Sequence, residues 1–332
     1  NLTDELVYAG SKLAMAEMIK TGTVMFNDMY FNMEQTAKAT DEVGMRATLG
    51  YGMIDLFDDE KRKQELKEAK KLIDSTHNTA DGRIKVAVTP HAPNTCSGEL
   101  ISDAAKLAKD NNVKLHIHVA ETKDEVEMIK DQHGMTPFEY LDSLNALSSD
   151  MIAAHGVWTT DDEIKTLAQR GVTISHNPSS NMKLASGIAP VAKYLEGGVN
   201  VTIGTDGVAS NNNLDMFSEM KLTALLQKVD TLDPKVANTK EVFDMATVNA
   251  ANALGINSGE IKEGKLADIM LIDANVPHMV PMIDVMSNII YSSLNDVNTV
   301  ICDGKILLQD KELQTINEAE IMKDVKVAAK EL

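Results

Sequence analysis

Short runs of aliphatic and β-branched residues recur along the first two thirds of the chain, and each run ends in polar residues. Such runs are typical of buried strands, whereas apolar positions three or four residues apart predict helices. A helix is predicted at the very start, with Leu6, Leu13 and Met18 on one face and Gly22 as its stop. The strands are predicted at residues 23–29, 46–54, 84–90, 113–121, 151–155, 172–176 and 201–206.

Polar amphipathic segments separate these strands and predict helices. The alternation of strand and helix implies a parallel sheet with crossover connections. An open, doubly wound sheet would need a glycine-rich phosphate turn after an early strand, and the sequence has no GxGxxG or Walker-type loop. We therefore predict an α/β fold, a (β/α)8 TIM barrel of which seven strands are visible and the first is missing. The helices are predicted at residues 58–75, 97–111, 136–144, 161–170 and 189–197.

The pattern changes after Asp206. Two helices are predicted at residues 214–228 and 240–254, followed by a β-rich run at 264–273. A hairpin is predicted at 298–308 with Asp303-Gly304 at its turn, and a charged helix at 317–332 closes the chain. We expect a barrel over residues 1–258 and a small β-element with a terminal helix over residues 259–332.

The composition and charge of the chain limit the kinds of molecule that it can bind. The 332 residues carry a formal net charge of −18, which argues against binding a nucleic acid. The two cysteines, Cys96 and Cys302, lie far apart and form no CxxC pair, which favours a reducing compartment. No apolar run is long enough for a membrane span, and no leader pattern is visible. These features predict a cytoplasmic protein that does not bind membranes.

The most informative stretch is residues 113–122, VKLHIHVAET. Side chains alternate across a strand, so His116 and His118 share the face opposite Leu115 and Ile117. Glu121 follows just past the strand end. An imidazole can hold a divalent cation that acidifies a water molecule, and a carboxylate can carry the proton. Histidines satisfied by hydrogen bonds in the core are an equally simple explanation of this strand alone.

Other predicted strands also end in ionisable residues, and in a barrel the carboxyl-terminal rim of the strands is where active sites lie. His118 and Asp206 offer nitrogen and oxygen ligands, although catalytic metal sites normally have at least three protein ligands. Taken singly, the remaining histidines are more often structural. The recurrence on successive strands favours a metal-dependent hydrolase site. The rim residues are His91, His118, Glu121, His155, His176 and Asp206.

Four motifs carry a family resemblance: HVAE at 118–121, AHG at 154–156, SHNPSSN at 175–181 and GTDG at 204–207. In this order they resemble the amidohydrolase superfamily, and within it the 5-methylthioadenosine/S-adenosylhomocysteine (5′-deoxyadenosine) deaminase family. The resemblance runs from MIKTGT at 18–23 to GKLAD at 264–268. It implies hydrolytic deamination of 5′-substituted adenosines, adenosine included, to the inosine analogues and ammonia.

The resemblance also implies roles for individual residues. His118 and Asp206 would bind one divalent metal, zinc in preference to iron or manganese. Glu121 would carry a proton to the purine ring nitrogen, His155 would steady the attacking hydroxide or the oxyanion, and Asp206 would help to remove a proton. The family further implies a homo-oligomer with a small-molecule nucleoside substrate. Substrate contacts are implied for His91, Glu121, His176, Asp206 and Ser210.

Two departures from the family pattern stand out. The His-x-His pair of the first barrel strand has no counterpart, because His116-x-His118 aligns with the fifth strand. We expect that strand, its two metal ligands, a substrate-contacting glutamate and the opening strands of the small β-domain upstream of Asn1. A chain beginning at Asn1 would then bind metal poorly and be inactive.

The second departure concerns specificity. Members that use S-adenosylhomocysteine often carry an arginine near the end of the third strand, but residues 49–55, LGYGMID, have none. A guanidinium binds a carboxylate with two hydrogen bonds, and Tyr51 cannot. We hypothesise a preference for 5′-deoxyadenosine or methylthioadenosine over substrates with a terminal carboxylate, although Arg62 could reach the site from the following loop.

Alternatives remain open at this stage. A guanine or pyrimidine deaminase, or a triazine chlorohydrolase, would use the same metal site with another pocket. A hydantoinase-like enzyme would need a carbamylated lysine where this chain has His91. Zinc deaminases with H-x-E and P-C-x-x-C are excluded by the context of the two cysteines. A catalytically inactive nucleoside-binding scaffold is the alternative outside enzymes, and intact Glu121 and Asp206 argue against it.

Overall fold

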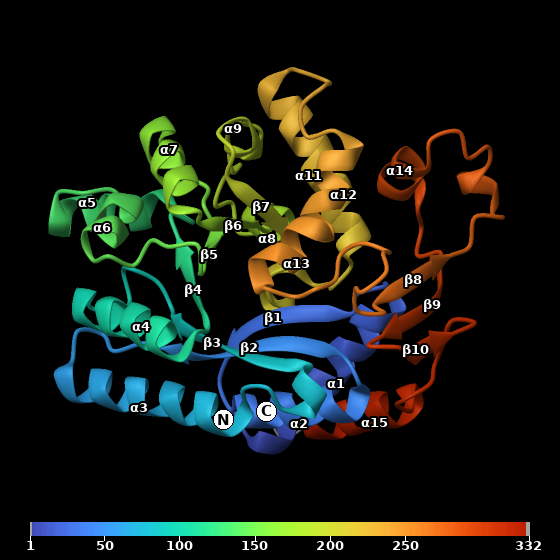
Figure 1. The fold of residues 1–332 in the computed structure, drawn as a ribbon, viewed down its shortest axis with the longest axis horizontal. Coiled ribbons are helices and arrows are strands. Elements are labelled where there is room, and N and C mark those ends of the chain that lie inside the picture. Colours follow the sequence, from blue (N-terminus) through green and yellow to red (C-terminus); the bar gives the residue numbers. More distant parts are fainter. Residues whose placement is uncertain (1, 330–332) are drawn as a thin grey trace.

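The structure is a computed structural model that describes residues 2–329. Its main feature is a curled parallel sheet whose seven strands follow one another in chain order, with helices on its outer side (Figure 1). This confirms the seven predicted strands and the TIM-barrel type of fold. The strands are β1 (Met25–Tyr30), β2 (Arg46–Met53), β3 (Ile84–Pro90), β4 (Lys114–Val119), β5 (Met151–His155), β6 (Thr173–His176) and β7 (Asn200–Ile203).

The register of these strands places their carboxyl-terminal ends together. His118 on β4 pairs with Ala154 on β5, and His176 on β6 pairs with Ile203 on β7. Within residues 2–329 no strand joins β7 to β1, so the described sheet is an open seven-stranded form of the barrel. The aliphatic side chains of β4, such as Ile117 and Val119, are fully buried, as the alternation predicted.

Helices follow the strands as the sequence predicted, and several of them begin at a capping side chain. The Thr122 hydroxyl accepts a hydrogen bond from the backbone N–H of Glu125 at the start of α5, for example. The sequence patterns did not predict α2, α5, α8 or α10. The helices of this part are α1 (Asp4–Lys20), α2 (Met33–Val43), α3 (Asp59–Thr76), α4 (Gly98–Asn111), α5 (Lys123–His133), α6 (Pro137–Ser143), α7 (Asp161–Arg170), α8 (Pro178–Lys183), α9 (Val191–Glu196) and α10 (Val208–Asn211).

The predicted helix at 240–254 is wrong as a single element. Two helices, α12 (Thr239–Ala246) and α13 (Val248–Leu254), meet at Thr247, whose φ of −128° and ψ of −92° are not helical. The Thr247 hydroxyl donates to the carbonyl of Phe243, a local bond that competes with regular helix geometry. The preceding helix, α11 (Met216–Thr231), agrees with the prediction.

A small antiparallel sheet lies beside the barrel, in the order β11-β10-β9-β8 (Figure 1). The predicted hairpin is present, with Asp303-Gly304 between β9 and β10. The short helix α14 (Val285–Ser287) lies between β8 and β9, and the terminal helix is α15 (Glu318–Ala328); the last residues of its predicted range, 330–332, lie outside the described part. The strands are β8 (Ile269–Ile272), β9 (Val297–Cys302), β10 (Lys305–Gln309) and β11 (Glu312–Leu313).

A buried ion cluster joins the two sheets. Arg46, at the start of β2, contacts Asp268 through Nε at 3.0 Å and Asp303 through Nη2 at 2.6 Å. The hydrophobic core is likewise one cluster, which includes Leu49 of the barrel and Val300 of the small sheet. A boundary at residue 258 therefore remains a proposal.

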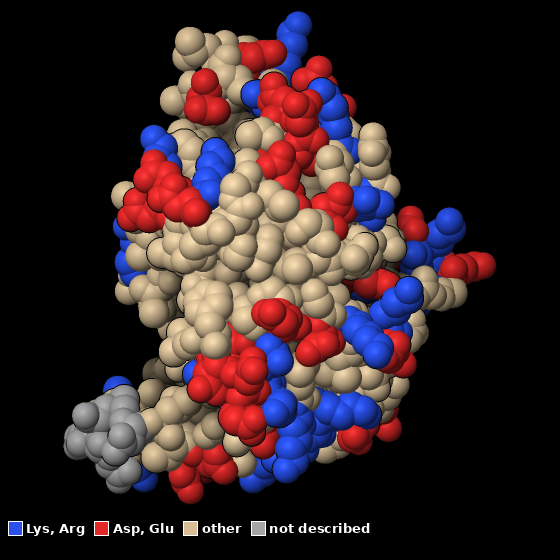
Figure 2. Space-filling view, turned by 90° about the vertical axis from the view of Figure 1, so that its left-hand side faces the viewer, with Lys and Arg blue, Asp and Glu red and all other residues tan. Residues whose placement is uncertain are grey.

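The surface is consistent with the acidic composition. On the face seen in Figure 2, acidic and basic side chains are interspersed around a broad area that has neither, and no basic stripe is present. Among residues 2–329, no helix has the length and apolar character needed to cross a membrane.

Candidate active site

Four imidazoles gather at the carboxyl-terminal ends of β3, β4 and β5. The ring centroid of His118 lies 5.0 Å from that of His91, 5.4 Å from that of His155 and 5.7 Å from that of His116. Three of these histidines were predicted site residues. The structure thus brings His91, His118 and His155 together around the stretch that the sequence singled out.

His118 is held in the form that a metal ligand needs. Its Nδ1–H donates to the backbone carbonyl of His91 at 2.8 Å, so that its Nε2 carries the free lone pair. Burial, reinforced by the neighbouring imidazoles, lowers its pKa well below the usual value. Burial also lowers the pKa of His116 to about 4, although the charge of nearby Asp206 opposes this shift. Both rings are therefore neutral at physiological pH.

Glu121 and His155 face each other beside this cluster. His155 Nε2 lies 3.6 Å from Glu121 Oε2, and His155 Nδ1–H donates to Asn181 Oδ1 at 2.9 Å. The other carboxylate oxygen, Glu121 Oε1, accepts a hydrogen bond from the Ser186 hydroxyl at 3.0 Å. A carboxyl group and an imidazole at this separation can exchange a proton through a substrate or one water molecule.

Asp206 follows β7 with a left-handed φ of 59°. Its Oδ2 accepts from the Ser180 hydroxyl at 2.6 Å, and its Oδ1 accepts from the Gly207 N–H at 2.6 Å. Ala120 and His155, at the ends of two other strands, also have positive φ values of 53° and 75°. Such backbone strain at non-glycine residues tends to occur at functional sites.

Glu125 was not among the predicted site residues, although it shapes the site. Its two carboxylate oxygens accept hydrogen bonds from the backbone N–H groups of Ala120 and Glu121, both at 2.8 Å. Burial raises its pKa, and these two bonds oppose the shift. The sequence TKDE at 122–125 has the form of a capping box, which could have indicated a side chain that folds back on this turn.

Within residues 2–329, no hydrogen bond or ring contact joins two predicted substrate residues, His176 and Ser210, to the imidazole cluster. His176 is fully buried, and within the described residues neither of its ring nitrogens has a hydrogen-bond partner. Ser210 lies on α10, four positions after Asp206 along the chain, and is half-buried. His91, by contrast, is partly exposed and donates to or accepts from the Thr95 hydroxyl at 2.8 Å. A substrate contact remains a prediction for all three.

Two residues of the site have side chains of the types that bind metal ions. His118 presents an unshared Nε2, and Asp206 presents a carboxylate, which are ligand types of zinc and related cations. No set of three or more His, Cys, Asp or Glu side chains within residues 2–329 is arranged to hold a metal by itself. The described part thus offers one nitrogen atom and one oxygen atom of the kinds that bind such a cation.

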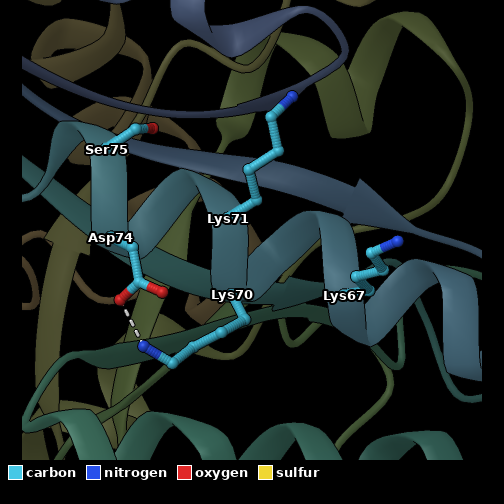
Figure 3. A pocket seen from close by; sticks show the side chains of 5 residues that line it. All are labelled: Lys67, Lys70, Lys71, Asp74 and Ser75. Atoms are coloured by element: carbon cyan, nitrogen blue, oxygen red, sulfur yellow. Dashed lines mark hydrogen bonds and ion pairs between the residues drawn. The ribbon is translucent and has the colours of Figure 1, made fainter.

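A separate depression lies on the outer surface of α3. Figure 3 shows that Lys67, Lys70, Lys71, Asp74 and Ser75 line it, with an ion pair between Lys70 and Asp74. All five side chains come from one exposed helix, and no imidazole is among them. This depression is a surface feature and contributes nothing to the site at the strand ends.

Comparisons with known proteins agree with this geometry. Residues 2–307 match the amidohydrolase family. A 5′-deoxyadenosine deaminase from Methanosphaera stadtmanae is 66% identical over 332 residues, which is 100% of this chain and 78% of that protein. A 5-methylthioadenosine/S-adenosylhomocysteine deaminase from Thermococcus sibiricus is 54% identical over 303 residues, covering 91% of this chain and 72% of that protein.

A solved structure of a related enzyme has the same fold. The crystal structure of an adenosine deaminase from Xanthomonas campestris with bound zinc superposes with a TM-score of 0.95 at 33% sequence identity. The alignment covers 100% of this chain and 76% of the Xanthomonas chain.

Proposed function

The chain belongs to the amidohydrolase family, and we propose that it is a metal-dependent hydrolytic deaminase of 5′-substituted adenosines. Its products are the inosine analogues and ammonia, and its substrates are 5′-deoxyadenosine, 5′-methylthioadenosine, S-adenosylhomocysteine and adenosine. The observation that carries the proposal is the pairing of Glu121 with His155 beside the free Nε2 of His118. The deaminase activities of the similar proteins point to the same chemistry.

The metal in this proposal is a single divalent cation, zinc, with His118 and Asp206 among its ligands. When bound, it lowers the pKa of a water molecule so that a nucleophile forms near neutral pH. The zinc bound by the Xanthomonas structure supports this choice.

The protein residues handle the protons. Asp206 accepts a proton from the attacking water, and His155 Nε2 steadies the oxygen as it adds to the amine-bearing carbon. Glu121 carries the other proton of the water molecule to the neighbouring ring nitrogen, and the proton held by Asp206 passes to the amino group. The carbon–nitrogen bond then breaks, the amino group leaves as ammonia, and the ring retains the oxygen.

Further features belong to the same proposal. We infer a preference for substrates without a terminal carboxylate, because residues 49–55 offer Tyr51 and no arginine. Homo-oligomeric assembly and a cytoplasmic location are inferred from the family and from the composition.

A substrate panel tests the function. The zinc-supplemented protein is incubated with the four adenosines, and with guanosine, cytosine and a chlorotriazine as competitors, while ammonia or chloride release is measured. We expect ammonia from the adenosines alone, fastest with 5′-deoxyadenosine or methylthioadenosine. Chloride release would indicate a chlorohydrolase, and tight adenosine binding without ammonia would indicate an inactive scaffold.

A further inference from the structure

We propose that one short segment, Ser180–Ser186, positions three of the side chains that have a role in the proposed reaction, Glu121, His155 and Asp206. This inference rests on the proposed deaminase function and assigns no new reacting group. We call residues 180–186 the positioning segment. It includes the second half of α8 and the turn that follows, and it contacts groups at the ends of β4, β5 and β7.

Each of these three side chains makes one hydrogen bond with this segment. The Ser180 hydroxyl donates to Asp206 Oδ2 at 2.6 Å. Asn181 Oδ1 accepts from His155 Nδ1–H at 2.9 Å. The Ser186 hydroxyl donates to Glu121 Oε1 at 3.0 Å. Three groups that lie far apart in the sequence therefore share one supporting element.

The polar side chains of the segment are buried, which makes their partners matter. Ser180, Asn181 and Ser186 are 0%, 1% and 5% exposed. A buried polar group without a partner is costly, and hydrogen bonds to charged groups are stronger than neutral ones. Each of these hydrogen bonds consequently holds two side chains in place, the one in the segment and the catalytic group that it contacts.

The backbone of the segment is itself locked. The Ser186 N–H donates to the Asn181 carbonyl at 2.8 Å, and the Trp158 indole N–H donates to the Ser186 carbonyl at 2.7 Å. Gly187 follows with a φ of 131°, and a Cβ at this position would lie 2.9 Å from a Val157 methyl group. The turn after α8 can therefore hardly move without breaking its bonds to Asn181 and to Trp158.

Contacts at both ends of α8 fix the segment on its other side. The Ser179 N–H donates to Glu219 Oε2 at 3.2 Å, and the Lys183 ammonium donates to the Ala209 carbonyl at 2.8 Å. The segment is thus attached to α11 and to α10 beyond Asp206.

These bonds decide which atoms remain free for the reaction. Ser186 occupies Glu121 Oε1, so Oε2, the oxygen nearer His155, is the one that exchanges protons. Asn181 fixes His155 with its proton on Nδ1, so Nε2 faces the reacting oxygen. Ser180 orients Asp206 so that its remaining lone pairs can serve the metal.

The first test removes the Ser186 hydroxyl, which donates a hydrogen bond to Glu121. Ser186→Ala is compared with Ser186→Thr, which keeps a hydroxyl, and with Ser143→Ala. The latter removes a hydroxyl on α6 whose hydrogen bond within residues 2–329 is to the Tyr140 carbonyl. For Ser186→Ala we expect kcat to fall about tenfold or more with KM within about twofold, because the bond aligns a proton donor. Ser186→Thr should recover most of this loss, and Ser143→Ala should match the wild type.

The second test separates the three contacts. Ser180→Ala should lower zinc affinity about 10-fold or more in a competition with a chromogenic chelator, since it frees a metal-ligating carboxylate. Ser186→Ala and Asn181→Ala should leave zinc affinity unchanged while lowering kcat. Circular dichroism melting of every variant reports whether the fold is retained.

The outcomes are distinct. If the wild type releases ammonia and Ser186→Ala behaves like Ser143→Ala, the positioning role is overturned while the deaminase function stands. It is also overturned if Ser186→Thr is no better than Ser186→Ala in a fully folded protein, or if all three alanine variants lower zinc affinity equally. A wild type that deaminates no adenosine overturns the proposed function instead.

Discussion

Two clusters of buried ionisable side chains lie at opposite ends of the barrel strands, and they are built differently. At the start of β2, Arg46 is paired with Asp268 and Asp303. These partners raise the pKa of Arg46 even though burial opposes the charge. At the strand ends, burial instead keeps His116 and His118 neutral. In the first cluster the charged groups pair with one another. In the second, neutral imidazoles keep lone pairs available for a ligand.

The comparison teaches where function lies in this molecule. The paired cluster joins the barrel to the small sheet, as expected at the amino-terminal side of barrel strands, where residues serve stability. The imidazole cluster lies at the carboxyl-terminal side, where barrels carry their active sites. Changes in the two clusters should therefore affect different measurements.

The largest effect is expected from Glu121→Gln, which removes the proton carrier and keeps the shape of the side chain. We expect kcat/KM for 5′-deoxyadenosine to fall by about 10²–10⁴-fold, the usual contribution of a general acid–base group. The free energy of unfolding should change by less than about 1 kcal/mol. Activity within tenfold of the wild type would show that another group moves the proton.

Arg46→Met should have the opposite profile. It leaves the buried carboxylate of Asp268 unpaired, which costs about 3–5 kcal/mol of unfolding free energy. Denaturant unfolding measures this loss, and kcat of the folded variant should stay near that of the wild type. The double variant Arg46→Met/Asp268→Leu should regain part of the stability. A selective loss of kcat in Arg46→Met would contradict the division between the two clusters.

The buried imidazole of His176 should make stability depend on pH. Burial, together with charge on His155, lowers its pKa to about 3, below the unfolded value of about 6.5. The unfolded state therefore binds a proton more readily, so the stabilisation is complete above pH ~6.5 and is lost as the pH falls toward ~3.

A variant without the imidazole tests this. Between pH 6 and 4, unfolding free energies of His176→Leu should fall less steeply than those of the wild type, by about 1.4 kcal/mol per pH unit at most. Equal slopes in the two proteins would mean that His176 is not held neutral by the fold.

The smallest effect is expected from Thr95→Val, which removes the hydroxyl that contacts His91 Nδ1. If His91 contacts the substrate, losing its orientation should raise KM about fivefold with kcat within about twofold, the value of one neutral hydrogen bond. Steady-state kinetics measure both constants. An unchanged KM would show that the orientation of His91 does not matter for substrate binding.

The sequence predicted the strands and the imidazole cluster because both follow from local patterns. Strand periodicity and polar strand ends are visible along the chain, and parallel strands bring their ends together. The break at Thr247 was missed, since apolar spacing continues through it. The supporting contacts of Ser180, Asn181 and Ser186 could not be predicted, because their partners are set by how α8 packs. The motif at 175–181 marked this region without indicating which side chain contacts which.

The most direct test of the account measures ammonia release from 5′-deoxyadenosine by the wild-type protein, first after chelation and then after addition of zinc. The account predicts little ammonia after chelation and, with zinc, one ammonia for each 5′-deoxyinosine formed. Ammonia release that is equally fast with and without the metal would contradict the assigned metal chemistry. Absence of ammonia from zinc-loaded protein that binds the nucleoside would contradict the deaminase function itself.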